Sequence, residues 1–229
     1  MSYQGIYLIG LTGNIACGKS TVLATLRELG AQVIDADAVT HALQRPGEPV
    51  YAQIVAEFGP GVLAEPGGPI DRRALGAIVF NDPAALRRLE QIVHPAVHAH
   101  ILAWLTSLSD AGGRAGNQTE PTSQSAPRTP HASQVAVIDA IKLLESGWRP
   151  LCDAIWVVAC QPEQQLARLV ATRGLSDAEA RTRIAAQPPQ AAKVAQADVV
   201  IDNSGTLEGT RRQIEAAWQA IAPRITPPN

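Results

Sequence analysis

The sequence predicts an α/β fold of three layers, in which helices cover both faces of a central five-stranded parallel sheet. Five short apolar runs are separated by segments with helical spacing, and this alternation is typical of parallel sheets. The first run, residues 6–11, leads directly into a glycine-rich octapeptide. Residues 39–109 show helical spacing without a clear strand, so a helical insertion is expected between the second and third strands.

The octapeptide at residues 13–20 reads G-N-I-A-C-G-K-S and fits the pattern G-x-x-x-x-G-K-[ST]. In this pattern, the backbone N–H groups of a glycine-rich turn and the N-terminus of the next helix bind an anion. Lys19 would reach the outer phosphates of a nucleotide, and the Ser20 hydroxyl would hold a magnesium ion. The predicted fold is therefore of the P-loop NTPase type.

The chain after this loop predicts a helix and a second strand. The helix is expected to end at Gly30 with a left-handed cap, and the strand covers residues 32–34. Asp35 and Asp37 follow the strand, at the sheet edge where parallel sheets bind ligands. Asp37 is the candidate base for an acceptor hydroxyl, and Asp35 is expected to orient it or to serve magnesium. The alternative for Asp37 is an N-cap on a helix beginning at residue 38.

The middle of the chain predicts an insertion and a loop. The helical insertion, residues 39–109, is expected to form one wall of a substrate cleft, and Pro95 is expected to begin a new helix within it. Residues 110–134 are rich in Gly, Ser, Thr, Pro, Asn and Gln, which predicts a disordered polar loop. A docking segment for another protein is the alternative for this loop.

The third strand, residues 135–139, ends in a carboxylate. Because magnesium prefers oxygen ligands, Asp139 is expected to hold this ion together with Ser20, and a turn cap is its alternative. The fourth strand is expected at residues 154–159 and the fifth at 198–201, before a final amphipathic helix. The nucleotide-binding core is accordingly assigned to residues 1–38, 135–161 and 196–229.

Residues 162–195 predict a helical lid. A helix over 162–173 is expected to end at Gly174, and Ser176 begins a capping box for the next helix. Four arginines occur in this region: Arg168, Arg173, Arg181 and Arg183. They indicate a lid that closes over transferring phosphates, with a solvated basic helix face as the alternative. Lys193 is expected on a solvated helix face.

The composition limits the classes of partner. Of 229 residues, 46% are apolar, which is enough for a core without disulfides, and the formal net charge is −2. That charge gives no general attraction to nucleic acid or an anionic membrane, and no apolar run approaches the roughly 20 residues of a membrane span. Three cysteines without metal-ligand spacing and no targeting segment predict a reduced, cytoplasmic chain. We expect small-molecule partners and a monomer or weak homo-oligomer.

The function class follows from the loop and from its surroundings. The chain lacks the Asn-Lys-x-Asp motif for guanine specificity, and a core with a helical insertion and an arginine-rich lid is typical of a small-molecule kinase. Such an enzyme aligns an acceptor hydroxyl with the γ-phosphate of ATP. A kinase for a nucleoside monophosphate or another metabolite is one alternative, and a non-catalytic ATP-binding regulatory protein is another.

Several separated motifs occur together in one order. They are residues 9–13 (I-G-L-T-G) continuing through Ser20-Thr21, 33–37 (V-I-D-A-D), 94–95 (H-P), 143–147 (L-L-E-S-G), 173–176 (R-G-L-S), 180–187 (A-R-T-R-I-A-A-Q) and 200–205 (V-I-D-N-S-G). With these motifs the chain resembles the dephospho-coenzyme A kinase family, over nearly its whole length except residues 110–134. The resemblance implies transfer of the ATP γ-phosphate to the ribose 3′-hydroxyl of dephospho-coenzyme A.

The resemblance also implies roles for single residues. Asp37 matches the base of the family, Lys19 and Arg173 match phosphate ligands, and the Asn203 region lies where the adenine of ATP is held. The segment with His94 corresponds to the coenzyme A side. The residues assigned to ATP are Gly13, Asn14, Ile15, Ala16, Cys17, Gly18, Lys19, Ser20, Thr21 and Asn203.

One motif departs from the family pattern. Where the family typically reads Asp-x-Pro-Leu-Leu-Phe/Tyr-Glu, residues 139–145 read D-A-I-K-L-L-E, so Ile141 and Lys142 replace a proline and an apolar residue. Lys142 is a candidate phosphate ligand on the acceptor side. His94 and His98 are four residues apart, and a shared metal is the alternative to a structural or substrate-binding role.

Overall fold

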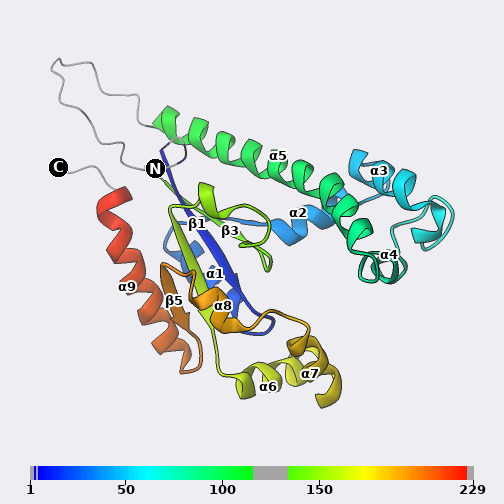
Figure 1. Cartoon of the computed structure of the whole chain (residues 1–229). Helices are drawn as coiled ribbons and strands as arrows, with labels where there is room; N and C mark the ends of the chain where they lie inside the picture. Colours follow the sequence, from blue (N-terminus) through cyan, green and yellow to red (C-terminus); the bar gives the residue numbers. More distant parts are fainter. Residues whose placement is uncertain (1–2, 4, 116–133, 226–229) are drawn as a thin grey trace. The chain divides into compact units, whose positions relative to one another are not determined.

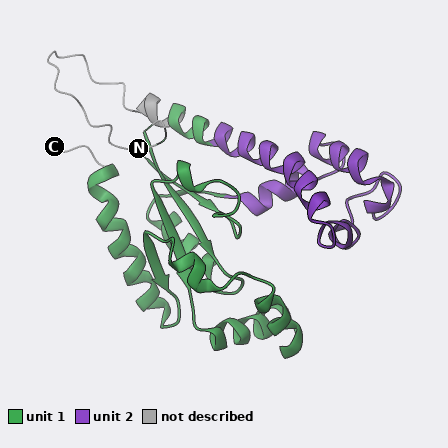
Figure 2. Ribbon diagram, in the orientation of Figure 1, with its two compact units in different colours: residues 1–34, 105–229 green, residues 35–104 purple. Residues whose placement is uncertain are grey.

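Figure 1 shows the computed structural model, which describes residues 3, 5–115 and 134–225. The chain forms two compact units (Figure 2): residues 1–34 with 105–229, and residues 35–104. The first unit carries the sheet and the glycine-rich loop, and the second is helical.

The sheet has five strands, as predicted. They are β1 (Ile6–Gly13), β2 (Gln32–Asp35), β3 (Gln134–Asp139), β4 (Ala154–Ala159) and β5 (Val199–Asp202). Their order is β2-β3-β1-β4-β5, and β1 pairs in parallel with both β3 and β4, as β4 does with β5. Leu11 of β1 lies opposite Asp139 of β3, and Gly13 lies opposite Val158 of β4. The loop that follows β1 therefore begins between the carboxyl ends of β3 and β4.

The helices of the first unit are α1 (Lys19–Glu28), η2 (Arg149–Leu151), α6 (Pro162–Arg173), α7 (Asp177–Ala185), α8 (Gln190–Val194) and α9 (Leu207–Ile225). Among them, α1, α8 and α9 contact the strands of this sheet. The predicted helix ends are confirmed, because Gly30 and Gly174 have left-handed φ angles of 99° and 60°. Ser176 and Glu179 also form the expected capping box. Helix α7 ends at Ala185, and Pro189 is the N-cap of α8, a separate short helix that was not predicted.

The second unit consists of short helices and part of a long one. They are α2 (Ala36–Leu43), α3 (Pro49–Phe58), η1 (Pro60–Val62), α4 (Arg72–Val79) and α5 (Pro83–Ala115), which continues into the first unit. The expected helix start at Pro95 is wrong, because Pro95 lies inside α5. Its ring removes one backbone hydrogen bond, but four side chains at steps of four residues are buried along the helix. They are Val93, Val97, Ile101 and Leu105.

The boundary of the expected polar loop also differs. Helix α5 runs to Ala115 and β3 begins at Gln134, so both ends of the predicted loop over residues 110–134 belong to regular elements. The remainder, residues 116–133, lies outside the described residues.

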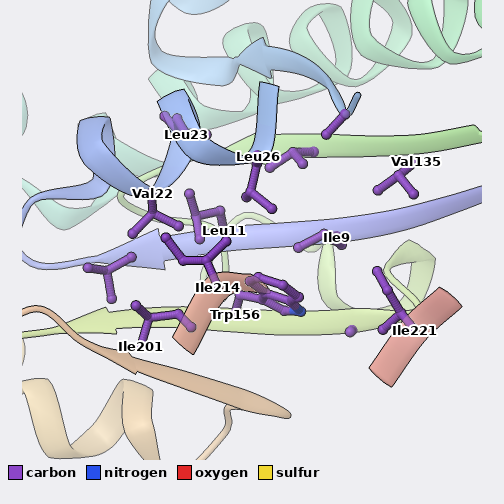
Figure 3. Packing of buried hydrophobic residues seen from close by; sticks show 14 of the residues in the cluster. Ile9, Leu11, Val22, Leu23, Leu26, Val135, Trp156, Ile201, Ile214 and Ile221 are labelled. Atoms are coloured by element: carbon purple, nitrogen blue, oxygen red, sulfur yellow. The ribbon is translucent and has the colours of Figure 1, made fainter. Parts of the chain in front are cut away.

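A hydrophobic core joins the sheet to α1 and α9. Side chains from β1, α1, β4 and α9 form one buried cluster (Figure 3), which includes Ile9, Leu26, Trp156 and Ile214. Each fully buried side chain of this size contributes about 1.5–3 kcal/mol. Strand residues alternate between faces, so Thr12 of β1 faces the opposite side, where α8 contacts β1. The glycine-rich loop therefore extends from a strand that is packed on both faces.

Candidate active site

The glycine-rich loop closes tightly between β1 and α1. Gly18 is the N-cap of α1 with φ 91°, and Ala16 is also left-handed with φ 58°. A Cβ on Gly18 would collide with Nδ2 of Asn203, and one on Gly13 would lie 2.6 Å from the Val158 carbonyl oxygen. Both glycines of the motif are therefore required by close neighbours, and Gly18 also by its backbone conformation.

Buried polar groups hold the carbonyl side of this loop. Asn203, which is 3% exposed, donates from Nδ2 to the Cys17 carbonyl oxygen at 2.8 Å. Its Oδ1 accepts from the Thr210 hydroxyl at 2.8 Å. Arg168 of α6 donates to the carbonyl oxygens of both Asn203 (2.8 Å) and Cys17 (3.4 Å). Asn203, expected where adenine is held, thus links the loop to α9 through its two side-chain polar atoms.

The α6–α8 segment, predicted as the lid, also contacts the loop through uncharged groups. Gln165 of α6 donates to the Ile15 carbonyl oxygen at 2.7 Å, and Gln187 accepts from the Ile15 N–H at 2.8 Å. Asn14 donates to the Pro188 carbonyl oxygen at 3.1 Å. The two glutamines were not predicted, because a glutamine in or beside a helix gives no signal of a long-range partner.

The arginines of this segment differ in their surroundings. Arg168 is half-buried against the loop, whereas Arg173, at the end of α6, is exposed. Arg181 forms an exposed ion pair with Asp177 at 2.7 Å, and Arg183 is also exposed. Arg168 hydrogen-bonds to the carbonyl oxygen of Cys17 in the loop and to that of Asn203 beside it.

The structure brings Lys19 and Asp139 together. Lys19 Nζ lies 3.9 Å from Asp139 Oδ1, and both side chains are mostly buried. Ser20 follows Lys19 in the first turn of α1 and is exposed. A cation, a carboxylate and a hydroxyl therefore come from adjacent elements at the carboxyl edge of the sheet.

Lys193 corrects one expectation. It was expected on a solvated face, but it is 3% exposed and donates from Nζ to the Ile141 carbonyl oxygen at 2.6 Å. Thr12 donates to the same oxygen at 3.1 Å, and Lys193 Nζ lies 3.4 Å from the Thr12 hydroxyl. The short helix α8 buries this lysine because it contacts β1 and β4. Lys142, the candidate acceptor ligand, is exposed in the same segment after β3.

The other predicted acceptor residues belong to the second unit. Asp35 is the N-cap of α2 and accepts from the Ala38 N–H at 2.9 Å. The N-cap alternative for Asp37 is therefore wrong, since Asp37 lies in the first turn of α2, where it is exposed. His94 is half-buried on α5.

One contact in this unit has no counterpart in the sequence analysis. Nη1 of Arg72 on α4 lies 2.7 Å from Nε2 of His41. His41 is four residues after Asp37 on α2. Because arginine can only donate, His41 accepts at Nε2 in this contact. The sequence gives no direct signal for this pair, because its members are 31 positions apart.

Comparison with known proteins assigns the chain to a family. The family model described as dephospho-CoA kinase matches residues 7–112 and 120–209, a range that includes the loop, Asp37 and Asn203. The chain belongs to the dephospho-CoA kinase family. A dephospho-CoA kinase from Symbiobacterium thermophilum is 50% identical over 213 residues, which cover 93% of this chain and 80% of that protein.

Solved structures agree with this family and fold. The crystal structure of TT1252 from Thermus thermophilus matches with a TM-score of 0.72 and 32% identity, over 94% of this chain and 97% of that one. A dephospho-CoA kinase from Campylobacter jejuni matches with a TM-score of 0.63 and 26% identity, over 95% and 98% of the two chains. Within the described residues, no helix is long and apolar enough to cross a membrane.

Proposed function

We propose that this chain transfers the γ-phosphoryl group of ATP to the ribose 3′-hydroxyl of dephospho-CoA, giving CoA and ADP. The observation that carries the proposal is the glycine-rich loop at the end of the central strand, with Lys19 and Asp139 3.9 Å apart, in a member of the dephospho-CoA kinase family. The small-molecule substrates are ATP and dephospho-CoA. We also propose that the protein is cytoplasmic and is a monomer or weak homo-oligomer.

The loop supplies the ATP site in this proposal. The N-terminus of α1 and the backbone N–H groups of the loop bind the phosphates, and Lys19 neutralises charge on the outer ones. Ser20 and Asp139 offer oxygen ligands of the kind magnesium prefers, and two protein oxygens suffice because this ion usually keeps waters and phosphate ligands. When bound, magnesium would neutralise charge on the β- and γ-phosphates. Arg173, exposed at the end of α6, is the further phosphate ligand.

The second unit supplies the acceptor residues in this proposal. Asp37 is exposed in the first turn of α2 and accepts the proton of the 3′-hydroxyl as that oxygen attacks the γ-phosphorus. Asp35 positions Asp37, since its carboxylate caps the helix that carries Asp37. His94 and Lys142 are the proposed contacts to the remainder of the acceptor.

The test is detection of product by mass spectrometry. Purified protein is incubated with magnesium and ATP, and separately offered dephospho-CoA, adenylate, cytidylate and shikimate. We expect one added phosphate on dephospho-CoA, at the 3′ position, and none on the other acceptors. Product from another acceptor alone would support a different metabolite kinase, and ATP binding without any product would support the regulatory alternative.

A further inference from the structure

Two cysteines far apart in sequence meet beside the glycine-rich loop. Cys17 is in the loop itself, and Cys160 follows β4 directly. Their Sγ atoms lie 3.2 Å apart, although 143 positions separate them. Cys17 is 0% and Cys160 is 4% exposed, and both are free thiols. The parallel pairing of β1 with β4 produces this meeting, because it aligns the ends of the two strands.

Neighbouring groups hold both cysteines in place. The Gln190 carboxamide oxygen lies 3.3 Å from the Cys17 sulfur and accepts from the Cys160 N–H at 3.1 Å. Its Nε2 donates to the Cys160 carbonyl oxygen at 3.2 Å. The Cys17 carbonyl oxygen is in turn fixed by Asn203 and Arg168. The two sulfur atoms are therefore kept side by side by contacts that do not depend on the thiols bonding to each other.

The two thiols differ in acidity. The pKa of Cys160 is lowered, mainly because the Cys17 side chain hydrogen-bonds to its thiolate, and the nearby Arg168 guanidinium adds to this effect. The same hydrogen bond, together with burial, raises the pKa of Cys17. At Cys152 burial raises the pKa to about 12. Because the thiolate is the reactive form, Cys160 is the better nucleophile of the three.

We propose that Cys17 and Cys160 form a redox-sensitive modification site, at which a peroxide closes an intramolecular disulfide that disables the ATP loop. The Cys160 thiolate attacks one oxygen of hydrogen peroxide, the O–O bond breaks, and Cys160 sulfenic acid and one water form after protonation. The Cys17 sulfur then attacks the sulfenic sulfur, the S–O bond breaks, and the Cys17 proton leaves with the hydroxide as a second water. The two thiols lose two electrons and two hydrogens, which reduce the peroxide.

The disulfide would distort the loop. A disulfide bond is about 2.0 Å long, so the sulfurs must approach by about 1 Å from their present separation. Cys17 is flanked by the left-handed residues Ala16 and Gly18, which leave the loop little freedom to follow without moving its N–H groups. The thiol contact to Gln190 is also lost. Loss of ATP binding is therefore expected, and its effect on catalysis rests on the proposed function, whereas disulfide formation does not.

The experiment oxidises the full-length protein with hydrogen peroxide and follows two readouts that need no acceptor. We expect an intact mass lower by about 2 Da under denaturing conditions, with a Cys17–Cys160 crosslinked peptide after digestion. Binding of a fluorescent, non-hydrolysable ATP analogue with magnesium should weaken by at least about tenfold and recover with dithiothreitol. Cys160→Ser should bind the analogue normally and keep binding it after peroxide, whereas the control Cys152→Ser should behave like the wild type.

Several outcomes would overturn the proposal. Sulfinic or sulfonic acid on Cys17 without any crosslink would show that the pair does not close. Equal sensitivity of Cys160→Ser and wild type would assign the loss to Cys17 alone, and a disulfide with unchanged analogue binding would refute control of the loop. Should Cys160→Ser unfold, Cys160→Ala replaces it, because alanine is apolar and suits this buried position. A protein that fails the kinase test can still pass this one, so the two proposals are tested separately.

Discussion

The loop of the first unit and helix α2 of the second carry their proposed functional groups in different ways. The loop is held by Gln165 of α6, by Gln187, which follows α7, and by Asn203, which follows β5. Asn203 is itself held by Thr210 of α9, so the loop conformation is fixed by distant parts of the chain. Helix α2 presents Asp37 exposed in its first turn, and the supporting contact of Asp35 is local. A phosphate-binding loop made of backbone groups thus depends on side chains from distant parts of the chain, here Gln165, Gln187 and Asn203, which we call the buried frame. A single carboxylate needs only a capped helix to hold it in place.

The largest expected effect separates chemistry from nucleotide binding. Asp37→Asn keeps the shape of the side chain but removes the base, so kcat should fall by about 10²–10⁴-fold. The affinity for ATP should stay unchanged, because the loop belongs to the other unit. Steady-state kinetics with dephospho-CoA and ATP-analogue titration measure the two quantities.

The matched control for this change is Asp35→Asn. Asparagine caps helices about as well as aspartate, so this variant should keep most of its activity and stability. Near-normal turnover of Asp37→Asn would show that the base is another group.

The second prediction tests the buried frame of the loop. Gly18→Ala combines a left-handed φ with a collision against Asn203, whereas Gly30→Ala has a similar φ of 99° and no neighbouring atom within 4 Å. Both variants should lose about 1–2 kcal/mol of stability from the backbone conformation. Gly18→Ala should lose about 1–3 kcal/mol more from overpacking and should also weaken ATP binding. Urea unfolding of the two variants side by side measures the difference, and equal losses would contradict the role of Asn203.

The third prediction concerns the buried lysine behind the loop. Lys193→Met removes a charged donor that lies 2.6 Å from the Ile141 carbonyl oxygen, which keeps its hydrogen bond from Thr12. Because hydrogen bonds from charged groups are the stronger ones, the free energy of unfolding should fall by about 1–3 kcal/mol. Lys142→Met changes an exposed lysine of the neighbouring segment and should alter stability by less than about 0.5 kcal/mol. Thermal and urea unfolding of both variants give the comparison, and similar values for the two would mean that the burial of Lys193 contributes nothing.

The smallest expected effect is on acid stability. The pKa of Asp198 is lowered by its hydrogen bond from Arg149, despite partial desolvation, and the Ile155 N–H also donates to it. A carboxylate with a lowered native pKa stabilises the folded state at pH values above its unfolded pKa of about 3.9. This stabilisation is lost as the pH falls through the native pKa. Because the pair is nearly half exposed, the contribution should stay below about 1 kcal/mol.

The measurement is urea unfolding of wild type and Asp198→Asn at pH 7 and pH 3. The variant should be less stable at pH 7 and closer to the wild type at pH 3. Arg149→Met should reduce the pH dependence in the same way, and an unchanged profile in both variants would contradict the assignment to this pair.

Much of the fold and part of the candidate site were predictable because their signals are local. The glycine-rich octapeptide, the apolar runs and the capping box of α7 each depend on residues within one element, and the structure has the predicted strands and helix ends. The family was likewise predictable, because several motifs occur in one order. The positions of strand ends differ by one or two residues, as for β1 and β5.

The features that were not predicted depend on contacts between residues far apart in the sequence or on buried packing. Gln165, Gln187 and Lys193 are polar helix-region residues whose partners lie about 50 to 180 positions away, and no spacing rule connects them. Pro95 misled the prediction because buried packing along α5 outweighs the cost of one missing hydrogen bond.

The strand order has a consequence for how the chain folds during synthesis. All eight residues of β1 are buried, yet its neighbours begin at Gln134 and Ala154, so the ribosome must produce more than half of the chain before β1 can pair. Contacts of such sequence separation slow folding, and an unpaired apolar strand is a template for aggregation in the meantime. The central position of β1 places the glycine-rich loop between the carboxyl ends of two strands. The same position means that β1, the first strand synthesised, stays unpaired on both sides until its two neighbours have been made.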